Sequence, residues 1–540
     1  MTAKRKLFLV VFNLVLFPVL LSAQSKGLDE TVNDAFMPIA IWWENLVFTE
    51  ITIMGVGIPI VLIFLLSGAL FFTVYFGFIN IRHFPTAIQV VRGKYDDLEK
   101  IDTAQNSELA KSNEDLKGTI KDESEHGEVN HFQALATAVS GTVGLGNIAM
   151  VAVAISFGGP GATFWMIVAG VLGMSSKFVE CTLGVKYRDI DIDGNVYGGP
   201  MYYLSQGLKE QGFKRLGKVL AITFAVLCVG ASFGGGNAFQ TNQAAAQIIA
   251  QFGLEGASSG SIIGFVFALC VGIVIIGGIK RIAKVTEKIV PLMAILYVGA
   301  ALFIICSNYT FIDDAFGLIF SEAFTPGATI SGGFIGVMIQ GFRRAAFSNE
   351  AGAGSAAIAH SAVNTKFAAS EGLVGLLEPF IDTVVICTMT ALVIIMFNEN
   401  GAFIYGDVVN GLALMEDGSR LGGVNITSLA FDTAIPGSSF ALAIAVILFA
   451  FSTILSWSYY GLQAWKFLFG RSKRSDLAYK LIFLIFTVLG AAVTLEAVIK
   501  FSEAMILALV FPNMIGLLFL FPKVKRELNK YFNVIKLQTK

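Results

Sequence analysis

The sequence predicts an all-α polytopic membrane protein in which one helix precedes two inverted sets of five, giving eleven transmembrane helices in the mature chain. The first observation is composition: of 540 residues, 55% are hydrophobic and 14% are charged, and the mean hydropathy is +0.71. A soluble globular chain carries about 25% charged residues. The second is a series of long apolar segments, and the third is a pair of glycine-rich interruptions at matching places. Disordered, collagen-like and soluble nucleic-acid-binding proteins are excluded.

The N-terminus indicates a cleaved signal peptide over residues 1–23. A basic start, MTAKRK, is followed by the apolar run LFLVVFNLVLFPVLL and then by the small residues SAQS. This is the order of regions in a secretory leader. The alternative is an uncleaved extra helix. Cleavage leaves residues 24–50 as an extracytoplasmic N-terminal segment.

Eleven segments have roughly the 20 apolar residues that a membrane span needs. The helix that precedes the two sets covers 51–80. The first repeat, 133–308, and the second, 330–525, are separated by an external loop at 309–329, and another external loop covers 398–437. Within the two repeats the expected spans are 133–156, 161–185, 217–250, 261–279, 287–307, 330–360, 372–397, 438–468, 477–499 and 502–522.

Lysine and arginine are concentrated in alternate loops, which orients the chain because basic loops stay in the cytoplasm. The tail 526–540 is basic, whereas the loop 398–437 contains only Arg420. The mature N-terminus is therefore expected outside and the C-terminus in the cytoplasm, in the plasma (inner) membrane. Residues 81–132 form a cytoplasmic charged insertion, either a solvated tether or a regulatory contact.

Motifs for enzymatic chemistry do not occur in the sequence. The five cysteines lie scattered in apolar runs without a CxxC, which predicts neither disulfides nor a thiolate metal site. Gly144 and Gly146 lack the third glycine of a dinucleotide fingerprint, and neither HExxH nor GxxxxGK[ST] occurs. We expect no catalytic residue, no organic cofactor and no nucleic-acid partner, and we expect a lipid bilayer as the surroundings.

Two of the expected spans are interrupted by small residues. The span 133–156 contains GTVGLGN, and 330–360 contains SNEAGAGSAA. Glycine costs about 1 kcal/mol relative to alanine in a helix, so both segments unwind easily. Small residues often serve only close helix packing. Here each interruption opens a five-helix set, and an odd number of spans inverts the second set. This pattern favours a secondary transporter with its site at the midplane.

Several longer motifs are similar to one known family. Residues 128–525 contain, in this order, GTVGLGNIAMVAVAISFGGPGATFWM, NVYGGPMYYL, GGGNAFQ, FRRAAFSNEAGAGSAAIAHSAV, EGLVGLLEPFIDTVVICTMTAL and STILSWSYYG. Together they resemble the alanine/glycine:cation symporter family, also called sodium:alanine symporters. The resemblance implies an inverted five-plus-five fold of the LeuT type with one preceding helix. It also implies sodium-driven uptake of alanine or glycine, with proton coupling in some members.

A zwitterionic amino acid needs donors for its carboxylate and a small pocket for its side chain. The N–H groups at a broken helix end suit a carboxylate because the helix dipole is positive there. Gln240 is a polar amide in a membrane helix, and such groups usually face the bundle interior. Trp457 either walls off the side-chain pocket or is ordinary interior packing. The expected substrate-binding residues are Thr142, Gly144, Gly146, Asn147, Gln240, Phe342 (as an aromatic lid), Thr453 and Trp457.

Sodium prefers oxygen ligands, and Ser452 and Thr453 are adjacent hydroxyls in an apolar span. The string GTVGLGN is similar to the first-helix break of the neurotransmitter:sodium symporters, where break carbonyls and helix-8 hydroxyls hold a sodium ion. By that similarity one Na⁺, the coupling ion, is expected among Ser140, Val143, Phe449, Ser452 and Thr453, with Phe449 contributing its carbonyl. The alternative is that both hydroxyls bond back to the carbonyl four residues earlier.

Ionisable residues inside membrane spans are expensive unless they are paired or hydrated. We expect arginine–carboxylate pairs near the cytoplasmic half that hold or release an inner gate. A proton-coupling carboxylate is the alternative. Pairing predicts that removal of Glu350 alone harms folding or transport, and that removal of both partners partly rescues it. The gating residues are Arg343, Arg344, Glu350 and Asp382, and the other intramembrane carboxylates noted are Glu180 and Glu378.

The sequence therefore predicts a secondary active transporter that couples sodium to the uptake of a small neutral amino acid, alanine or glycine, by alternating access. The alternatives are a proton-coupled amino acid symporter, a membrane sensor that binds amino acids without transport, a channel, and an intramembrane enzyme. The choice between alanine and glycine and the oligomeric state stay open.

Overall fold

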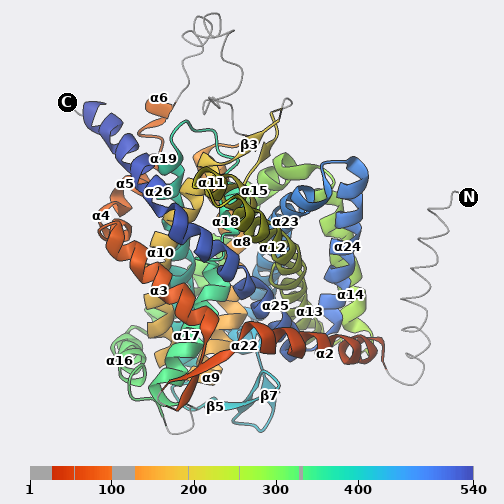
Figure 1. Ribbon diagram of the computed structural model, residues 1–540. Coiled ribbons are helices and arrows are strands. Elements are labelled where there is room, and N and C mark those ends of the chain that lie inside the picture. The colour runs from red at the N-terminus through yellow and green to blue at the C-terminus, as the bar shows by residue number, and fades with distance from the viewer. Residues whose placement is uncertain are drawn as a thin grey trace, which may run out of the picture.

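The computed structural model describes residues 27–53, 55–99, 128–191, 194–254, 256–327 and 332–538, and it is built mostly from helices (Figure 1). Small antiparallel sheets of two or three strands connect some of them. The expected signal peptide at 1–23 lies outside the described residues, as does most of the charged insertion at 81–132.

The described residues contain seven helices that are long and apolar enough to cross a membrane, or eight when the bent pair His131–Thr142 and Gly146–Gly158 counts as one span. Two further apolar helices, Ile60–Tyr75 and Ser259–Ile275, are shorter. The protein is therefore a helical, multi-pass membrane protein. The count of eleven spans and the inverted repeat of the LeuT type remain predictions.

The N-terminal part differs from the single span expected at 51–80. A β-hairpin occupies residues 50–59, so the apolar helix α3 begins only at Ile60. β-Branched residues in EITI favour a strand, and Gly55 has the positive φ of 82° that suits the tight connection. The elements here are α2 (Leu28–Val47), β1 (Glu50–Ile53), β2 (Val56–Pro59), α3 (Ile60–Tyr75), α4 (Ile79–Arg82), α5 (Phe84–Val91) and α6 (Asp96–Glu99).

The segment expected as the first repeat opens with a broken helix. Helix α8 (His131–Thr142) is separated by an unwound stretch from a π-helical turn, η1 (Gly146–Met150), which continues as α9 (Val151–Gly158), and the two halves are bent by 49°. The elements that follow are α10 (Gly161–Lys186), β3 (Asp189–Ile190), β4 (Val196–Tyr197), α11 (Pro200–Glu210), α12 (Lys214–Phe233), η2 (Gly234–Ala238), α13 (Phe239–Phe252), α14 (Ser259–Ile275), α15 (Gly278–Ser307), η3 (Tyr309–Phe311) and α16 (Ile312–Glu322).

The second segment also opens with an interrupted helix. Helix α17 (Gly333–Asn349) ends where Glu350 takes a left-handed φ of 54°, and α18 (Ala356–His360) resumes after Gly352 and Gly354. The elements that follow are α19 (Ala368–Gly375), α20 (Leu377–Pro379), η4 (Phe380–Cys387), α21 (Thr388–Phe397), β5 (Phe403–Val409), β6 (Leu412–Met415), β7 (Arg420–Leu421), α22 (Val424–Ala434), α23 (Ser439–Phe469), α24 (Lys473–Ala492), α25 (Leu495–Ala508) and α26 (Val510–Gln538).

One expected span is divided differently. The range 477–499 contains a helix boundary, because α24 ends at Ala492 and α25 begins at Leu495. The side chain of Thr494 accepts a hydrogen bond from the Ala497 N–H and so caps α25. Hydropathy alone does not detect such a boundary, because a single threonine barely changes the mean of an apolar run.

The helices pack as two groups that meet at α8. Helix α10 packs against α17, α18 and α19, whereas α23 packs against α12, α13 and α15. Helix α8 contacts both α18 and α23. The interrupted first span therefore lies at the junction of the two groups. A movement of one group relative to the other would change the contacts of this span.

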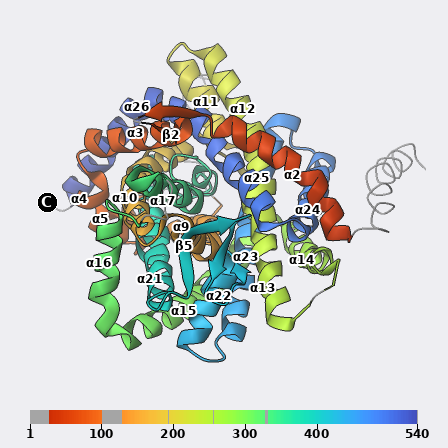
Figure 2. The ribbon, with the colours of Figure 1, turned by 90° about the horizontal axis from the view of Figure 1, so that it is seen from below.

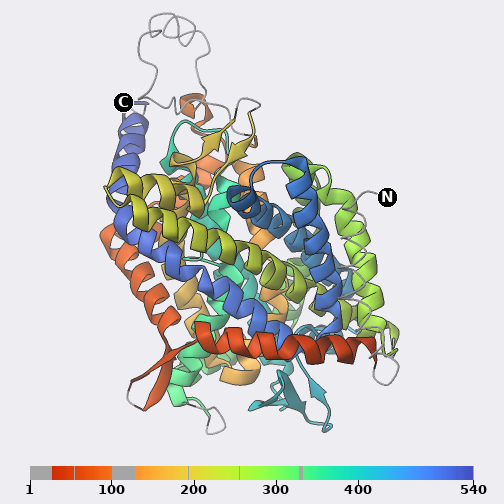
Figure 3. The same ribbon diagram turned by 45° about the vertical axis from the view of Figure 1, so that its right-hand side comes forward.

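The molecule has two opposite faces. One carries α2, the β1–β2 hairpin and the β5–β7 sheet and is called here the α2 face; the other carries the β3–β4 hairpin and the end of α26 and is called the C-terminal face (Figure 1). Helix α2 lies across its face, at a steep angle to the long helices (Figure 3), and it lies in front of them in the view from below (Figure 2). The predicted orientation puts the α2 face outside.

Candidate functional site

The break between α8 and η1 is held by two side-chain amides. The backbone leaves the helical region at Val143, with φ −75° and ψ 84°. The side-chain oxygen of Asn147 accepts from the Gly144 N–H at 3.0 Å, and that of Gln240 accepts from the Leu145 N–H at 3.0 Å. Unwound backbone inside a bilayer has to find its partners within the protein. These two amides replace the hydrogen bonds that the helix has lost.

Gln240 is the residue through which α13 reaches the break. It is buried directly after η2, and its Nε2 donates to the Gly235 carbonyl at 3.0 Å. A methyl group on Gly144 would lie 3.0 Å from the Gln240 side-chain oxygen and would also collide with the Thr453 hydroxyl. Glycine at position 144 therefore allows α8, α13 and α23 to approach one another at this point.

The residues expected around sodium meet where α8 crosses α23. The Thr453 hydroxyl donates to the Ser140 carbonyl at 2.9 Å, and the Ser140 hydroxyl donates to the Ser452 carbonyl at 2.9 Å. The Ser452 hydroxyl donates to the Phe449 carbonyl at 3.0 Å, a bond within its own helix. Ser452 thus bonds back within its own helix, to the carbonyl three residues earlier rather than four, whereas Thr453 reaches across to α8. Val143 lies next to this crossing, at the break itself.

Ser456 extends this contact and was missed in the sequence analysis. Its hydroxyl donates to the Thr137 carbonyl at 3.0 Å and to the Ser140 hydroxyl at 3.1 Å. Ser456 follows Ser452 by four residues, so both lie on the same face of α23. That spacing was a signal in the sequence for a hydroxyl stripe facing α8.

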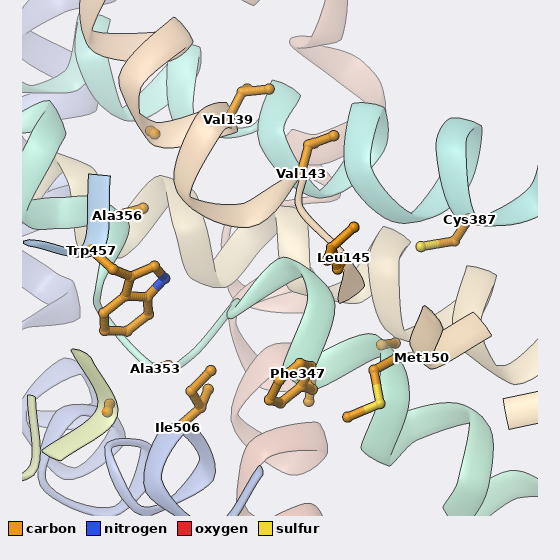
Figure 4. Close-up of a cluster of buried hydrophobic side chains, with 14 of the residues drawn as sticks. Val139, Val143, Leu145, Met150, Phe347, Ala353, Ala356, Cys387, Trp457 and Ile506 are labelled. Atoms are coloured by element: carbon orange, nitrogen blue, oxygen red, sulfur yellow. The ribbon is translucent and has the colours of Figure 1, made fainter. Parts of the chain in front are cut away.

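Trp457 closes one side of the same region. It is fully buried, and its indole N–H donates to Glu350 at 3.1 Å. Its ring packs on the backbone of Gly236 in η2, where a side chain would collide. Trp457, Leu145 and Phe347 belong to one buried hydrophobic cluster (Figure 4). The indole therefore packs in the interior and also bonds to a residue of the second interruption.

The aromatic residue that borders the break from α17 is Phe347 rather than Phe342. The ring of Phe347 packs edge-on against Phe239 at 5.1 Å, and a methyl group on Gly235 would lie 3.2 Å from it. Phe342 instead packs against Trp165 of α10, with ring centroids 5.5 Å apart. Two residues five apart in a helix point about 140° away from each other. The expected lid residue is therefore on another side of α17.

The remaining two substrate candidates differ in their surroundings. Gly146 faces α17, since a methyl group there would lie 3.3 Å from the Ser348 Cα. The Thr142 hydroxyl donates back to the Ala138 carbonyl at 3.3 Å. Gly146 therefore allows the first span to pack closely against α17, whereas the Thr142 hydroxyl is hydrogen-bonded within its own helix.

Asp382 lies beside the break and is not paired with an arginine, which corrects its expected place in a gate. The Nδ2 of Asn147 donates to the Asp382 carboxylate at 2.7 Å and to its backbone carbonyl at 3.0 Å. Hydroxyls of Ser348 and Thr383 donate to the same carboxylate at 2.9 and 2.7 Å. This fully buried carboxylate therefore links the first span to α17 and η4 through neutral donors.

Arg343 and Arg344 pair with carboxylates outside the expected gate. Glu503 of α25 accepts from Arg343 at 2.6 Å and also pairs with Arg344. Glu44 of α2 accepts from Arg343 at 2.7 Å and from Lys500 at 2.8 Å. These five residues are called the α2-face cluster, because they join α17 and α25 to α2.

The expected pairing of these arginines with Glu350 is therefore wrong. Glu350 accepts from the Trp457 indole and from the Ser355 hydroxyl. The arginine partners are distant in sequence, 160 residues away for Glu503 and 299 for Glu44. Their side of the molecule is also opposite to the C-terminal face, where the gate was expected.

A second buried charge cluster was recognised in the sequence only through Glu378. His360 contacts Glu371 at 2.5 Å and Glu378 at 2.6 Å, and Glu378 pairs with Lys177 at 2.9 Å. His131 pairs with the second oxygen of Glu371. These five residues are called the buried histidine chain. Lys177 in an apolar span was the available signal, because an intramembrane cation needs a partner.

An unwound helix stabilised by polar groups from several spans is the architecture of a secondary active transporter. The model of the sodium:alanine symporter family matches residues 101–540, and the chain belongs to this family. It is a multi-pass transporter of a family that moves amino acids with cations.

Two curated relatives agree with this assignment. The chain is 38% identical to the sodium/alanine symporter AgcS of Methanococcus maripaludis over 88% of this chain and 95% of that protein. It is 32% identical to the sodium/proton-dependent alanine carrier protein of Bacillus sp. (strain PS3) over 76% of this chain and 89% of that protein. Among solved structures, MhsT in complex with L-phenylalanine matches with a TM-score of 0.47 and 14% identity, over 74% of this chain and 99% of that one.

Proposed function

We propose that this protein couples sodium to the uptake of a small neutral amino acid, alanine or glycine, by alternating access. The observation that carries the proposal is the reciprocal pairing of Ser140 with Ser452 and Thr453, which gathers hydroxyl and carbonyl oxygens from α8 and α23. Family membership and the similarity to AgcS support the choice of sodium and alanine. The protein acts in the plasma (inner) membrane, with the α2 face outside.

Sodium binds among the oxygens of Ser140, Val143, Phe449, Ser452 and Thr453. All five contribute neutral oxygens, which suit a hard monovalent cation. The Thr453 hydroxyl exchanges its bond with the Ser140 carbonyl for the ion, so that both oxygens face it. Because α8 lies at the junction of the two helix groups and α23 belongs to one of them, the ion holds the junction against the α23 group.

The substrate carboxylate takes the N–H groups of Gly144 and Leu145, which the amides of Asn147 and Gln240 otherwise bond. An ionised acceptor makes a stronger hydrogen bond than an amide oxygen, so the exchange is favourable. Gln240 is thereby released to contact the substrate. Trp457 and Phe347 restrict the side-chain space to a methyl group or a hydrogen, and Phe347 replaces Phe342 as the aromatic lid.

The gate belongs to the α2-face cluster. Pairing of Arg343 and Arg344 with Glu503 holds α17 against α25, and Glu44 adds α2 to the same contact. With this face outside, the pairs form an outer gate that separates when sodium and substrate enter. Glu350 and Asp382, which accept hydrogen bonds from neutral donors, take no part in this gate.

Reconstituted proteoliposomes test the proposal. Uptake of radiolabelled alanine should saturate, require an inward sodium gradient and be inhibited by unlabelled glycine. Equal uptake with potassium in place of sodium at fixed pH would rule out sodium coupling. Binding of alanine without any uptake would support the sensor instead.

A proton-coupled symporter is the second candidate. A relative is named as a sodium/proton-dependent carrier, and Asp382 is a buried carboxylate in direct contact with the break. This candidate predicts alanine uptake driven by an inward proton gradient in sodium-free buffer. The same liposomes measure both gradients separately.

A further inference from the structure

Five titratable side chains form a line from the C-terminal face into the interior. His131 at the start of α8 contacts one oxygen of Glu371, whose other oxygen lies 2.5 Å from Nδ1 of His360. Nε2 of His360 lies 2.6 Å from Glu378, whose second oxygen is 2.9 Å from the Lys177 Nζ. The His131 side chain is 10% exposed and those of Glu371 and Lys177 are 0% exposed. The buried histidine chain thus has one end near solvent and one in the core.

The contacts of His360 set a minimum number of protons. An ionised carboxylate only accepts hydrogen bonds, and a neutral imidazole carries a single N–H. Both ring nitrogens face carboxylate oxygens, at 2.5 Å for Glu371 and 2.6 Å for Glu378. Two protons are therefore needed in these two contacts. Either His360 is an imidazolium or one of the two carboxyl groups is protonated.

The surroundings favour retention of this proton. Three carboxylates, Glu378, Glu180 and Glu350, act on Lys177, and Glu371 adds a fourth further along the chain, beyond His360. An excess of buried negative charge is unfavourable, and one bound proton offsets part of it. Among the described residues, the titratable groups that face the chain include Glu180 and Cys181 of α10, Glu350 after α17 and Tyr460 of α23, and Tyr203 of α11 lies beside Glu180 and Cys181.

The shape of the cluster does not indicate a metal site. In the part of the chain that the structure describes, no three His, Cys, Asp or Glu side chains are grouped to hold a metal ion. The members follow one another in a line, through hydrogen bonds from His131 to Glu378 and through an ion pair from Glu378 to Lys177. Such a line suits a proton, which moves along hydrogen bonds and needs no cage of ligands.

The line also connects elements that are far apart in sequence. His131 belongs to α8, Glu371 to α19, His360 to α18, Glu378 to α20 and Lys177 to α10. Three of these elements, α18, α19 and α20, pack against α10, and α8 is the half-helix that leads to the break. The protonated chain therefore holds this half of α8 on the α10 group.

We propose that the buried histidine chain is a proton-binding site that exchanges through His131 at the C-terminal face, and that its proton keeps α8 packed on α18 and α19. Loss of the proton leaves the charges of Glu371 and Glu378 on either side of a neutral ring. The end of α8 that carries His131 is then released from α18 and α19. The pH on the C-terminal face therefore controls the transport cycle. The effect on the cycle rests on the proposed function, whereas the proton site does not.

The proton is measured directly on the wild-type protein. The full chain contains four histidines, so ¹⁵N-histidine labelling and solid-state NMR in lipid give few signals, and His360→Gln assigns one of them. We expect an imidazolium signal, or a protonated carboxyl band in infrared spectra, at pH 7.5, about one unit above the ordinary histidine range. A neutral His360 with no protonated carboxyl group at pH 7.5 would overturn the proposal.

The functional role is tested by the pH dependence of alanine uptake. Glu371→Gln removes a neighbouring negative charge, so the pH midpoint of uptake should fall by about one unit. The control Glu527→Gln neutralises a carboxylate of α26 that pairs with Lys186 at 2.6 Å outside the chain, and it should leave the midpoint unchanged. A Glu371→Gln protein that binds alanine normally and keeps the wild-type midpoint contradicts the role.

His131→Gln provides a second variant in case Glu371→Gln fails to fold. It keeps a side-chain donor for Glu371 but cannot carry the proton, so the His360 signal should respond to a pH jump at least about tenfold more slowly. An unchanged response rate would exclude exchange through His131. Failure of the wild type to take up alanine with sodium would defeat the proposed function alone, because the NMR result does not depend on transport.

Discussion

The two buried charge clusters differ in the chemistry of their cations and in what they join. The α2-face cluster is built on arginine and links α17, α25 and α2. The buried histidine chain is built on imidazoles and links α8 to helices around α10. An arginine stays charged at any physiological pH, whereas a histidine changes its charge near neutrality.

Because of this difference, we expect the α2-face cluster and the buried histidine chain to have different functions. A pair whose charges are permanent can be undone only when its helices move apart, which suits a gate between helix groups. A chain whose charge depends on a proton can change without any prior movement, which suits control of a packed half-helix. Where α8 crosses α23, the hydroxyl and carbonyl groups of Ser140, Ser452 and Thr453 carry no formal charge. Such neutral oxygens suit reversible binding of sodium.

The largest effect is expected from Glu503→Gln. Glu503 is fully buried and is shared by both arginines, so its neutralisation removes their main counter-charge. Loss of one partner from a buried ion pair costs roughly 3–5 kcal/mol. Thermal unfolding of the purified protein should show this loss, whereas Glu496→Gln, on the exposed side of α25 near Lys500, should change little. Equal melting temperatures for the two variants would show that the charge of Glu503 in the α2-face cluster does not stabilise the protein more than a surface charge does.

A smaller effect is expected from Thr453→Val, which keeps the shape of the side chain and removes its hydroxyl. Loss of a buried hydrogen-bonding group costs about 1–3 kcal/mol, so the sodium concentration for half-maximal uptake should rise by about tenfold. The buried histidine chain should retain its pH behaviour. An unchanged sodium dependence, measured in proteoliposomes, would place the ion elsewhere.

A still smaller effect is expected from Glu44→Gln. Glu44 is 16% exposed and bonds to Arg343 and Lys500, so water compensates part of its loss. We expect a decrease in the free energy of unfolding of about 1 kcal/mol or less. A cost as large as that of Glu503→Gln would mean that α2, and not α25, is the main partner of the arginines.

The smallest effect is expected at the C-terminal face, where the exposed Glu210 pairs with the half-buried Lys523. Burial raises the pKa of Glu210, but Lys523 and Tyr187 outweigh it and hold this pKa below its usual value. A lowered pKa adds stability above the unfolded value of about 4.3 and loses it as the pH falls through the folded value. Because the Glu210 side chain is 55% exposed, Glu210→Gln should alter acid unfolding only slightly. A shift of the uptake profile between pH 6 and 8 in this variant would assign that profile to surface groups.

Much of the helical layout was predictable because it depends on local sequence. The broken first span was expected from the glycines of GTVGLGN, and the structure bends there by 49°. Asn147 was expected at the break, Gln240 was expected to contact the substrate, and both amides accept hydrogen bonds from the unwound backbone. By contrast, the hairpin at 50–59 and the cap at Thr494 were missed, because each depends on a few residues inside an apolar average.

The sequence by itself determined that this is a membrane protein. It also determined the positions at which the helices are interrupted and the polar residues that accompany the first interruption. These properties follow from the hydrophobicity and the backbone preferences of each segment, which do not depend on where the segment lies in the fold. Only the tertiary structure decided that Arg343 pairs with Glu503 rather than Glu350, that Phe347 rather than Phe342 faces the break, and that His360 joins Glu371 to Glu378. Those choices depend on which helix faces are in contact, and that is set by packing between segments hundreds of residues apart.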